Sequence, residues 1–138
     1  MINSAKQFIE LVDNGTVESL IKSKYVVISD EICYDIIDNY PDYVVNLAVN
    51  KNLSIPILKK LAKNKSWRVR WWVAMKRKLD YELFEKLSHD KDEAVRRMIA
   101  YNSKTPLKIL QAMYPDKVDD INEKLMERIS PASETRTT

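Results

Sequence analysis

Apolar and small residues recur at a fixed offset of 26 positions along the middle of the chain. Six sets of three residues align at this offset without a gap. The sets are Tyr43, Val69 and Val95; Leu47, Val73 and Ile99; Ala48, Ala74 and Ala100; Ile57, Leu83 and Ile109; Leu58, Phe84 and Leu110; and Leu61, Leu87 and Met113. Self-similarity at a period of this length indicates a tandem repeat, whose units stack to bury their apolar faces.

The spacing within each unit predicts two short helices. In the middle unit Val69 and Val73 lie four positions apart with Ala74 beside them, which predicts a first helix over about residues 67–76. Each second helix is expected to begin at a side-chain oxygen that accepts a helix N–H group, with proline tolerated in the first turn. These capping signals are Ser54 before Pro56, Asp80, and Thr105 before Pro106.

Helices are also expected on both sides of the three clear units. A degenerate fourth unit begins at Ser29, with Cys33 and Ile36 in the columns of Leu58 and Leu61. Residues 5–12 and 17–25 are expected to form a capping helix pair around the turn at Asn14-Gly15. One face of a final capping helix carries Val118, Ile121, Leu125 and Ile129. Helices with polar outer faces are expected at both ends, because they close a stacked array and favour a monomer.

These elements predict one all-α domain over residues 1–129, a right-handed α-solenoid of two-helix repeats with a period of about 26 residues. The N-terminal cap is expected over 1–28, the repeats over 29–116 and the C-terminal cap helix over 117–129. Residues 130–138 are poor in apolar side chains and are expected to form a disordered tail.

The repeat resembles the leucine-rich repeat variant, a HEAT-like helical repeat with the pattern VRxxVAxN followed by TPxxxLxxLAxD. The third unit carries Val95-Arg96-x-x-Ile99-Ala100-x-Asn102 and then Thr105-Pro106-x-x-x-Leu110, whereas the first has Tyr43-Val44 where Val-Arg is expected. The resemblance covers roughly residues 29–116 and implies a fold without implying a function. Some members of that family carry an iron–sulfur cluster on a separate cysteine-rich segment, which a chain with Cys33 alone does not provide.

One row of positions on the first helices is predicted to face outward as a ribbon. Trp, Tyr, Met and Arg occupy much of this ribbon, and these residue types are enriched at protein interfaces. The expected partner-binding residues are Asp42, Val45, Asn46, Val49, Arg68, Trp71, Trp72, Met75, Arg97, Met98 and Tyr101. Trp71 is expected to be exposed, and Trp72 to be either exposed or tucked under a neighbouring helix.

The net charge of +3 is the sum of three unequal segments. Residues 1–50 carry a net −5, residues 51–114 a net +10, and residues 115–138 a net −2. Asp30, Glu31, Asp35 and Asp38 form a candidate acidic contact face on the N-terminal third. The basic segment is interpreted either as a solvated face or as a phosphate-binding surface. Arg70 and Arg96 are expected to be structural, with Asp90 or Asp116 as partner.

Composition limits the chemistry of the chain. The single glycine, Gly15, excludes a glycine-rich nucleotide loop, and one cysteine and one histidine, Cys33 and His89, form no metal site or catalytic set. We therefore expect no cofactor and no enzymatic activity. HEAT-like DNA glycosylases share the architecture but need more repeats. Without an apolar run long enough for a signal peptide or a membrane span, the chain is expected in the cytoplasm.

Together these features predict a protein-binding module that is a monomer when free. A short helical array of this kind also loosely resembles immunity proteins encoded beside bacterial contact-dependent growth inhibition toxins. That resemblance implies a cognate toxin domain, most plausibly a nuclease, whose active site the chain occludes. The alternative is a nucleic-acid-binding repeat domain, and a generic scaffold fragment is a third interpretation.

Overall fold

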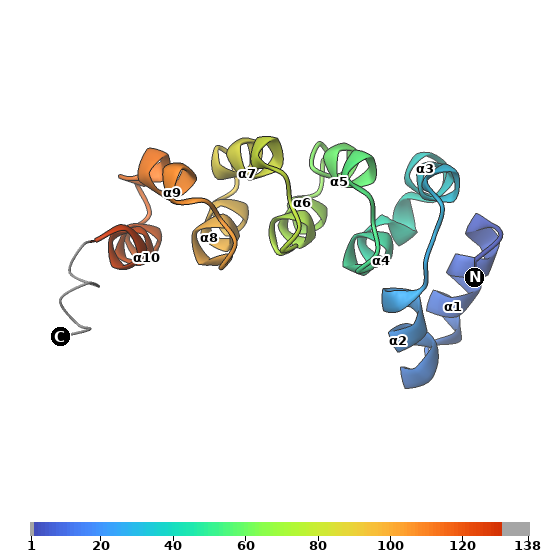
Figure 1. Cartoon of the computed structure of the whole chain (residues 1–138). Helices are drawn as coiled ribbons and strands as arrows, with labels where there is room; N and C mark the ends of the chain where they lie inside the picture. Colours follow the sequence, from blue (N-terminus) through green and yellow to red (C-terminus); the bar gives the residue numbers. More distant parts are fainter. Residues whose placement is uncertain (1, 131–138) are drawn as a thin grey trace. The chain divides into compact units, whose positions relative to one another are not determined.

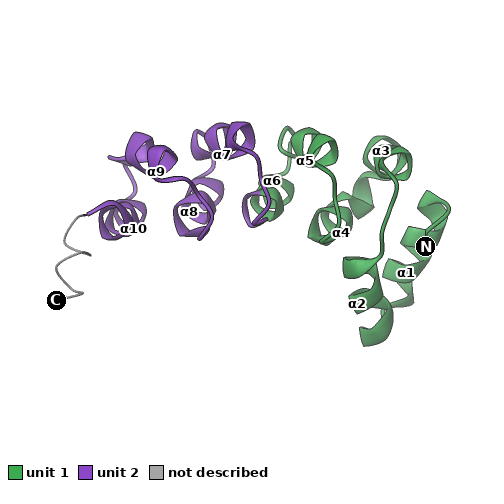
Figure 2. Cartoon of the chain, in the orientation of Figure 1, with its two compact units in different colours: residues 1–73 green, residues 74–138 purple. Residues whose placement is uncertain are grey.

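The computed structural model describes residues 2–130, which form ten α-helices and one 3-10 helix and contain no strand. The predicted all-helical class is therefore confirmed. The chain divides into two compact units, Met1–Val73 and Ala74–Thr138 (Figure 2). The expected single domain stays a prediction, and the expected tail lies outside the described residues from residue 131 onward.

The first unit contains a helical hairpin followed by helices in two rows. α1 packs against α2 and α3, and α2 packs against α4. Figure 1 shows α3 and α5 in one row and α4 and α6 in the other. The elements are α1 (Ala5–Asn14), α2 (Val17–Tyr25), α3 (Asp30–Asn39), η1 (Pro41–Tyr43), α4 (Val44–Val49), α5 (Ile55–Leu61) and α6 (Trp67–Ala74), whose last residue opens the second unit.

Side-chain caps and one glycine set the ends of the first three helices. The Ser4, Thr16 and Ser29 hydroxyls accept N–H groups at the starts of α1, α2 and α3. Gly15 ends α1 with φ of 71°, a left-handed conformation that glycine adopts without steric cost. The predicted N-terminal helix pair and its turn at Asn14-Gly15 are confirmed.

The second unit is a two-layer arrangement of four helices. α7 packs against α9 and α8 against α10, while each of the pairs α7–α8 and α9–α10 also makes contact (Figure 1). Asp80 and Asp92 cap α7 and α8 with their side chains. The helices are α7 (Tyr81–Ser88), α8 (Glu93–Tyr101), α9 (Leu107–Met113) and α10 (Asp119–Ile129).

The repeated apolar columns form the core of each unit. Every member of the six aligned sets except Tyr43 is at most 8% exposed, and Cys33 and Ile36 of the degenerate unit are also buried. Tyr43 lies instead in the 3-10 turn, where its hydroxyl donates to the Asp13 carboxylate at 2.8 Å. The next residue, Val44, is 3% exposed and takes the core position.

In the second unit, two side-chain donors close the ends of helices at the same spacing. Asn102 Nδ2 donates to the carbonyls of Ala74 and Lys76, which lie 28 and 26 residues earlier. Arg128 Nη1 donates to the carbonyls of Ala100 and Asn102 at the same two separations. The two side chains therefore satisfy equivalent orphan carbonyls at successive helix ends. Asn50, in the first unit, likewise donates to two carbonyls upstream, at Ser23 and Val26.

Arg70 and Arg96 have the structural role predicted for them. Arg70 Nη1 donates to the carbonyls of Asn64 and Lys65, and Arg96 Nη1 donates to those of Asp90 and Lys91. Both arginines are nearly buried, at 6% and 9% exposed. Each guanidinium thus fixes the loop five and six residues before it.

Three predicted details of the helices differ. Thr105 does not cap α9: its hydroxyl is buried and donates to the Ile99 carbonyl at 2.6 Å, so it closes the end of α8 instead. α6 ends at Ala74, two residues before the predicted end. In α10 only Ile121 and Leu125 are fully buried, because Val118 precedes the helix and Ile129 lies at its last residue.

Candidate protein-interaction surface

α2 buries two serines and exposes its large apolar side chains. Ser19 and Ser23 are 8% and 6% exposed, and small side chains at positions four apart let α2 approach its neighbours closely. The Ser19 hydroxyl donates to the Thr16 carbonyl at 3.0 Å. The Ser23 hydroxyl donates to the Leu20 carbonyl at 2.7 Å. Burial of these serines therefore leaves no hydroxyl without a partner.

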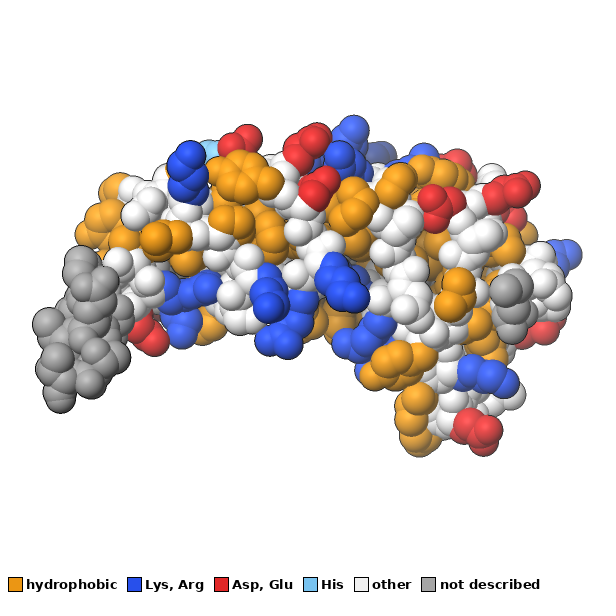
Figure 3. All heavy atoms as spheres, in the orientation of Figure 1, with side chains coloured by type: hydrophobic (Ala, Val, Ile, Leu, Met, Phe, Trp, Pro, Cys, Tyr) orange, Lys and Arg blue, Asp and Glu red, His pale blue; other side chains and the backbone are white. Residues whose placement is uncertain are grey.

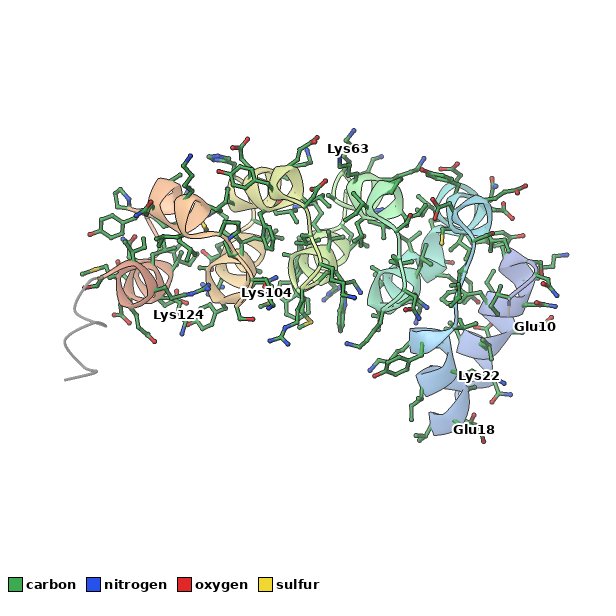
Figure 4. The ribbon with its side chains drawn as sticks, in the orientation of Figure 1. Glu10, Glu18, Lys22, Lys63, Lys104 and Lys124 are labelled. Carbon is green, nitrogen blue, oxygen red and sulfur yellow. The ribbon has the colours of Figure 1, made fainter. Side chains whose placement is uncertain are left out.

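Four large apolar side chains on the opposite side of α2 form a surface that we call the α2 stripe. Its members are Val17, Leu20, Ile21 and Tyr25, with exposed fractions of 76%, 41%, 53% and 56%. Figure 3 shows hydrophobic side chains along the part of the first unit that α2 occupies in Figure 1. Glu18 and Lys22 flank the stripe on the same helix (Figure 4). These four side chains thus present apolar area to solvent on one side of α2, where the exposed Lys24 also lies.

Hydrogen bonds fix the C-terminal end of the α2 stripe to the end of α4. Lys51 N–H donates to the Lys24 carbonyl at 2.7 Å, and Asn52 Nδ2 donates to the Tyr25 carbonyl. Together with the two bonds from Asn50, these contacts join α2 to the end of α4. The stripe therefore lies on a helix that is hydrogen-bonded to its neighbour.

The predicted ribbon residues of the first unit are accessible to different degrees. Asp42 and Arg68 are exposed, whereas Val45, Asn46, Val49, Trp71 and Trp72 are half-buried. The rings of Trp71 and Trp72 meet edge to face at 5.1 Å. The expected difference between the two tryptophans is thus not seen, because each shields part of the other. The Arg68 guanidinium lies 5.3 Å from the centre of the Trp67 ring.

The predicted ribbon residues of the second unit form a network with α10. Arg97 Nε donates to Asp120 at 2.6 Å, and its guanidinium also reaches Glu93. The hydrogen bond with Asp120 raises the pKa of Arg97, and the bond from Arg97 lowers the pKa of Asp120. Lys124 Nζ lies 4.9 Å from the centre of the Tyr101 ring. Because these charges are already engaged, Arg97 offers a partner less free charge than the sequence suggests.

Apolar side chains remain accessible beside this network. Met75 and Tyr101 are 38% and 47% exposed, and Met98 is half-buried. Lys104 lies just after α8 and Lys124 lies on α10 (Figure 4). This part of the ribbon therefore combines a few apolar contacts with a charged rim.

The candidate acidic face lies along α3. Asp30, Glu31, Asp35 and Asp38 are all exposed. Three of them already make local contacts: Asp30 accepts from the Ser54 hydroxyl, Asp35 from Asn39 and Asp38 from Lys60. Glu31 makes no such contact within residues 2–130. The face is solvated, with its charge partly compensated.

One of the two carboxylates predicted to pair with the structural arginines does so. Asp116 is 8% exposed at its side chain and forms an ion pair of 2.9 Å with Arg96, one of its two predicted partners. Burial acts to raise the pKa of Asp116, but hydrogen bonds from Arg96 and the Val118 N–H together with the Arg96 charge outweigh it. The pKa therefore lies below its usual range, as in a structural ion pair.

The two side chains weighed as possible catalytic or metal-binding groups are Cys33 and His89. Burial raises the pKa of the Cys33 thiol to about 12, and the Asp30 charge adds to the shift, so this side chain serves as a small core residue. His89 is exposed at the end of α7. Within residues 2–130 no group of three or more His, Cys, Asp or Glu side chains could hold a metal ion. Over the same part of the chain, every helix is too short or too polar to cross a membrane.

No protein-family model, curated protein or solved structure matches the chain. The surface must therefore be interpreted from its own geometry. The α2 stripe is the part of it that the sequence did not predict. An apolar row at positions 17, 20, 21 and 25 ordinarily indicates the buried side of a helix. The sequence does show that small serines occupy positions 19 and 23, on the opposite side of the helix. Small side chains allow that side to pack against neighbouring helices instead of the apolar side.

Proposed function

We propose that the chain is a protein-binding helical-repeat module, built as a right-handed α-solenoid with a period of about 26 residues between helical caps. The equal spacing of the Asn102 and Arg128 hydrogen bonds, at 28 and 26 residues, supports this periodicity. Arg70 and Arg96 support it further, because each donates to carbonyls five and six residues upstream. Stacked units of this kind expose a continuous side suited to contact with a macromolecule.

The observation that carries the proposal is the orientation of α2. Folding alone favours burial of large apolar side chains by about 25 cal/mol per Å² of area removed from water. In α2 the serines are buried and the α2 stripe is exposed. A fixed apolar face of this kind is typical of a protein contact that is completed by a partner.

We further propose that the partner is a toxin domain, a nuclease whose active site the chain covers. The exposed carboxylates of α3 complement the positive cleft that a nuclease needs to bind phosphates. The loose resemblance to immunity proteins of contact-dependent inhibition systems points to the same class of partner. The half-buried Trp71 and Trp72 add aromatic contacts of the kind found at interface centres.

Co-expression with the product of the neighbouring upstream gene tests this function. The parent chain is expected to protect cells from that product and to bind it in calorimetry. Ile21→Glu places a charge in the α2 stripe and is expected to abolish both effects. Met126→Glu is the matched control, because Met126 and Ile21 are both 53% exposed. Equal protection by both variants, or no toxicity of the neighbour, would contradict the proposal.

A nucleic-acid-binding function is the second candidate, and one observation favours it. Residues 51–73 contain no Asp or Glu but seven basic side chains, of which all but the buried Arg70 are at least partly accessible: Lys51, Lys59, Lys60, Lys63, Lys65, Arg68 and Arg70. Binding of DNA or RNA should weaken steeply with salt, because phosphate contacts release counterions. A protein complex that persists from low to moderate salt and after nuclease treatment would argue against this alternative.

A further inference from the structure

A groove in the first unit lies apart from the α2 stripe, which contributes none of its lining. It encloses about 1030 Å³ between the end of α3, the starts of α4 and α5, and the loop that joins α5 to α6. Its lining residues are Ile37, Pro41, Val44, Val45, Pro56, Val69, Asn64, Ser66, Lys59, Lys60, Lys63 and Lys65.

The floor of the groove is aliphatic. Val44 and Val69 are 3% and 1% exposed, and Ile37 and Val45 are half-buried beside them. Among the described residues, no aromatic ring and no carboxylate belongs to the lining. A ligand that fills the groove therefore meets branched aliphatic side chains and proline rings, which favour small apolar side chains over flat bases.

The rim of the groove carries four lysines, two at the end of α5 and two in the loop that follows it. Lys60 Nζ forms an ion pair of 3.0 Å with Asp38 and lies 5.5 Å from the centre of the Tyr34 ring. Lys63 and Lys65 are exposed and make no ion pair with any residue between 2 and 130. Lys63 extends outward from the end of α5 (Figure 4). The rim thus keeps uncompensated positive charge above an apolar floor.

We propose that this groove binds an acidic segment of another protein, in which carboxylates alternate with aliphatic side chains. Carboxylates would pair with Lys63 and Lys65 while Leu or Val side chains enter the aliphatic floor. The lining favours such a peptide over single-stranded nucleic acid for two reasons. It contains no aromatic platform for base stacking. It also contains no arginine, the residue whose planar fork matches phosphate geometry.

Fluorescence anisotropy with labelled ten-residue peptides tests this site on the full chain. The probe alternates Glu or Asp with Leu or Val, and a second peptide replaces each Leu and Val by Ser. The Lys63→Glu/Lys65→Glu variant is expected to weaken binding of the probe by about tenfold or more, since each reversal replaces attraction by repulsion. Lys104→Glu/Lys108→Glu makes the same charge change at exposed positions of the second unit and is expected to leave binding unchanged.

Each other outcome of this experiment overturns the proposal. Equal weakening by both double variants would show a general effect of net charge. Equal binding of the serine-substituted peptide would show that the aliphatic floor takes no part. Tighter binding of a labelled oligo-dT strand, lost in the Lys63→Glu/Lys65→Glu variant, would assign the groove to nucleic acid. Circular dichroism of all variants verifies that the helices remain folded. This experiment does not use the proposed toxin partner. A negative result for the groove would therefore leave the proposed contact through the α2 stripe unchanged.

Discussion

Arg128 makes the same pattern of hydrogen bonds as Asn102, which lies 26 residues before it in the chain. Each side chain donates through one nitrogen to two carbonyls, 28 and 26 residues upstream. The amide and the guanidinium differ in size and charge, yet they satisfy the same class of orphan carbonyl at a helix end. A charged side chain is accommodated at the last position because Arg128 is only half-buried there.

Removal of the Asn102 amide should destabilise the fold. Asn102→Ala leaves the Ala74 and Lys76 carbonyls without this donor, and unpaired buried polar groups cost about 1–3 kcal/mol each. We expect the free energy of unfolding in urea to fall by at least about 2 kcal/mol. Asn39→Ala, at an exposed position, should change it by less than about 0.5 kcal/mol. Similar losses in the two variants would show that the buried amide has no special role.

Because of the Arg96–Asp116 ion pair, the free energy of unfolding should depend on pH in the acidic range. Because the folded pKa of Asp116 is lowered, its ionised form favours the folded state, and this contribution is full above about pH 5 and fades as the pH falls through about 4. Asp116→Asn should therefore lose about 1–3 kcal/mol at pH 7. Its deficit relative to the parent should shrink in unfolding measured toward pH 3. A deficit that stays constant across this range would mean that the charge of Asp116 does not contribute.

The Cys33 thiol should react slowly with thiol reagents in the folded chain. Its thiol is buried and its pKa is raised to about 12, so little thiolate exists at neutral pH. Labelling by an aromatic disulfide reagent at pH 8 should be slow in buffer and fast in concentrated urea. Fast labelling in buffer would show that the α3 core opens readily or that the thiol is accessible.

Substitution of two isoleucines should have different effects on stability, because one lies in the core and the other in the α2 stripe. Ile36 in α3 is 0% exposed, whereas Ile21 in α2 is 53% exposed. Ile36→Ala should lower the free energy of unfolding by about 2–5 kcal/mol, because it leaves a cavity. Ile21→Ala should change it by less than about 0.5 kcal/mol. A large loss at Ile21 would show that the stripe is part of the hydrophobic core.

The repeat columns made much of the fold predictable from the sequence. Alanine recurs at positions 48, 74 and 100, next to branched residues, and all of these positions are buried. Such a pattern indicates close packing, because few other side chains fit at these positions. Arg70 and Arg96 were also predicted correctly as structural. Thr105 was predicted incorrectly, since a threonine before a proline fits a cap while its hydroxyl in fact closes the preceding helix.

The α2 stripe could not be predicted for a different physical reason. Helical periodicity reports which residues share a side, and it does not report which side faces a neighbour. In α2 close approach through Ser19 and Ser23 decides this, and the approach depends on helices α1 and α4. The expected polar outer face of the N-terminal cap was therefore wrong for α2, and the inferred preference for a monomer loses that support.

Capture of partners on immobilised chain tests the central claim most directly. Lysate of the source organism, treated with nuclease, is passed at moderate salt over the parent, Ile21→Glu and Met126→Glu forms, and bound proteins are quantified by mass spectrometry. We predict a protein that the parent and Met126→Glu retain and Ile21→Glu loses, and that binds the purified parent with the same dependence on Ile21. Identical sets of proteins on all three forms would contradict a contact through the α2 stripe.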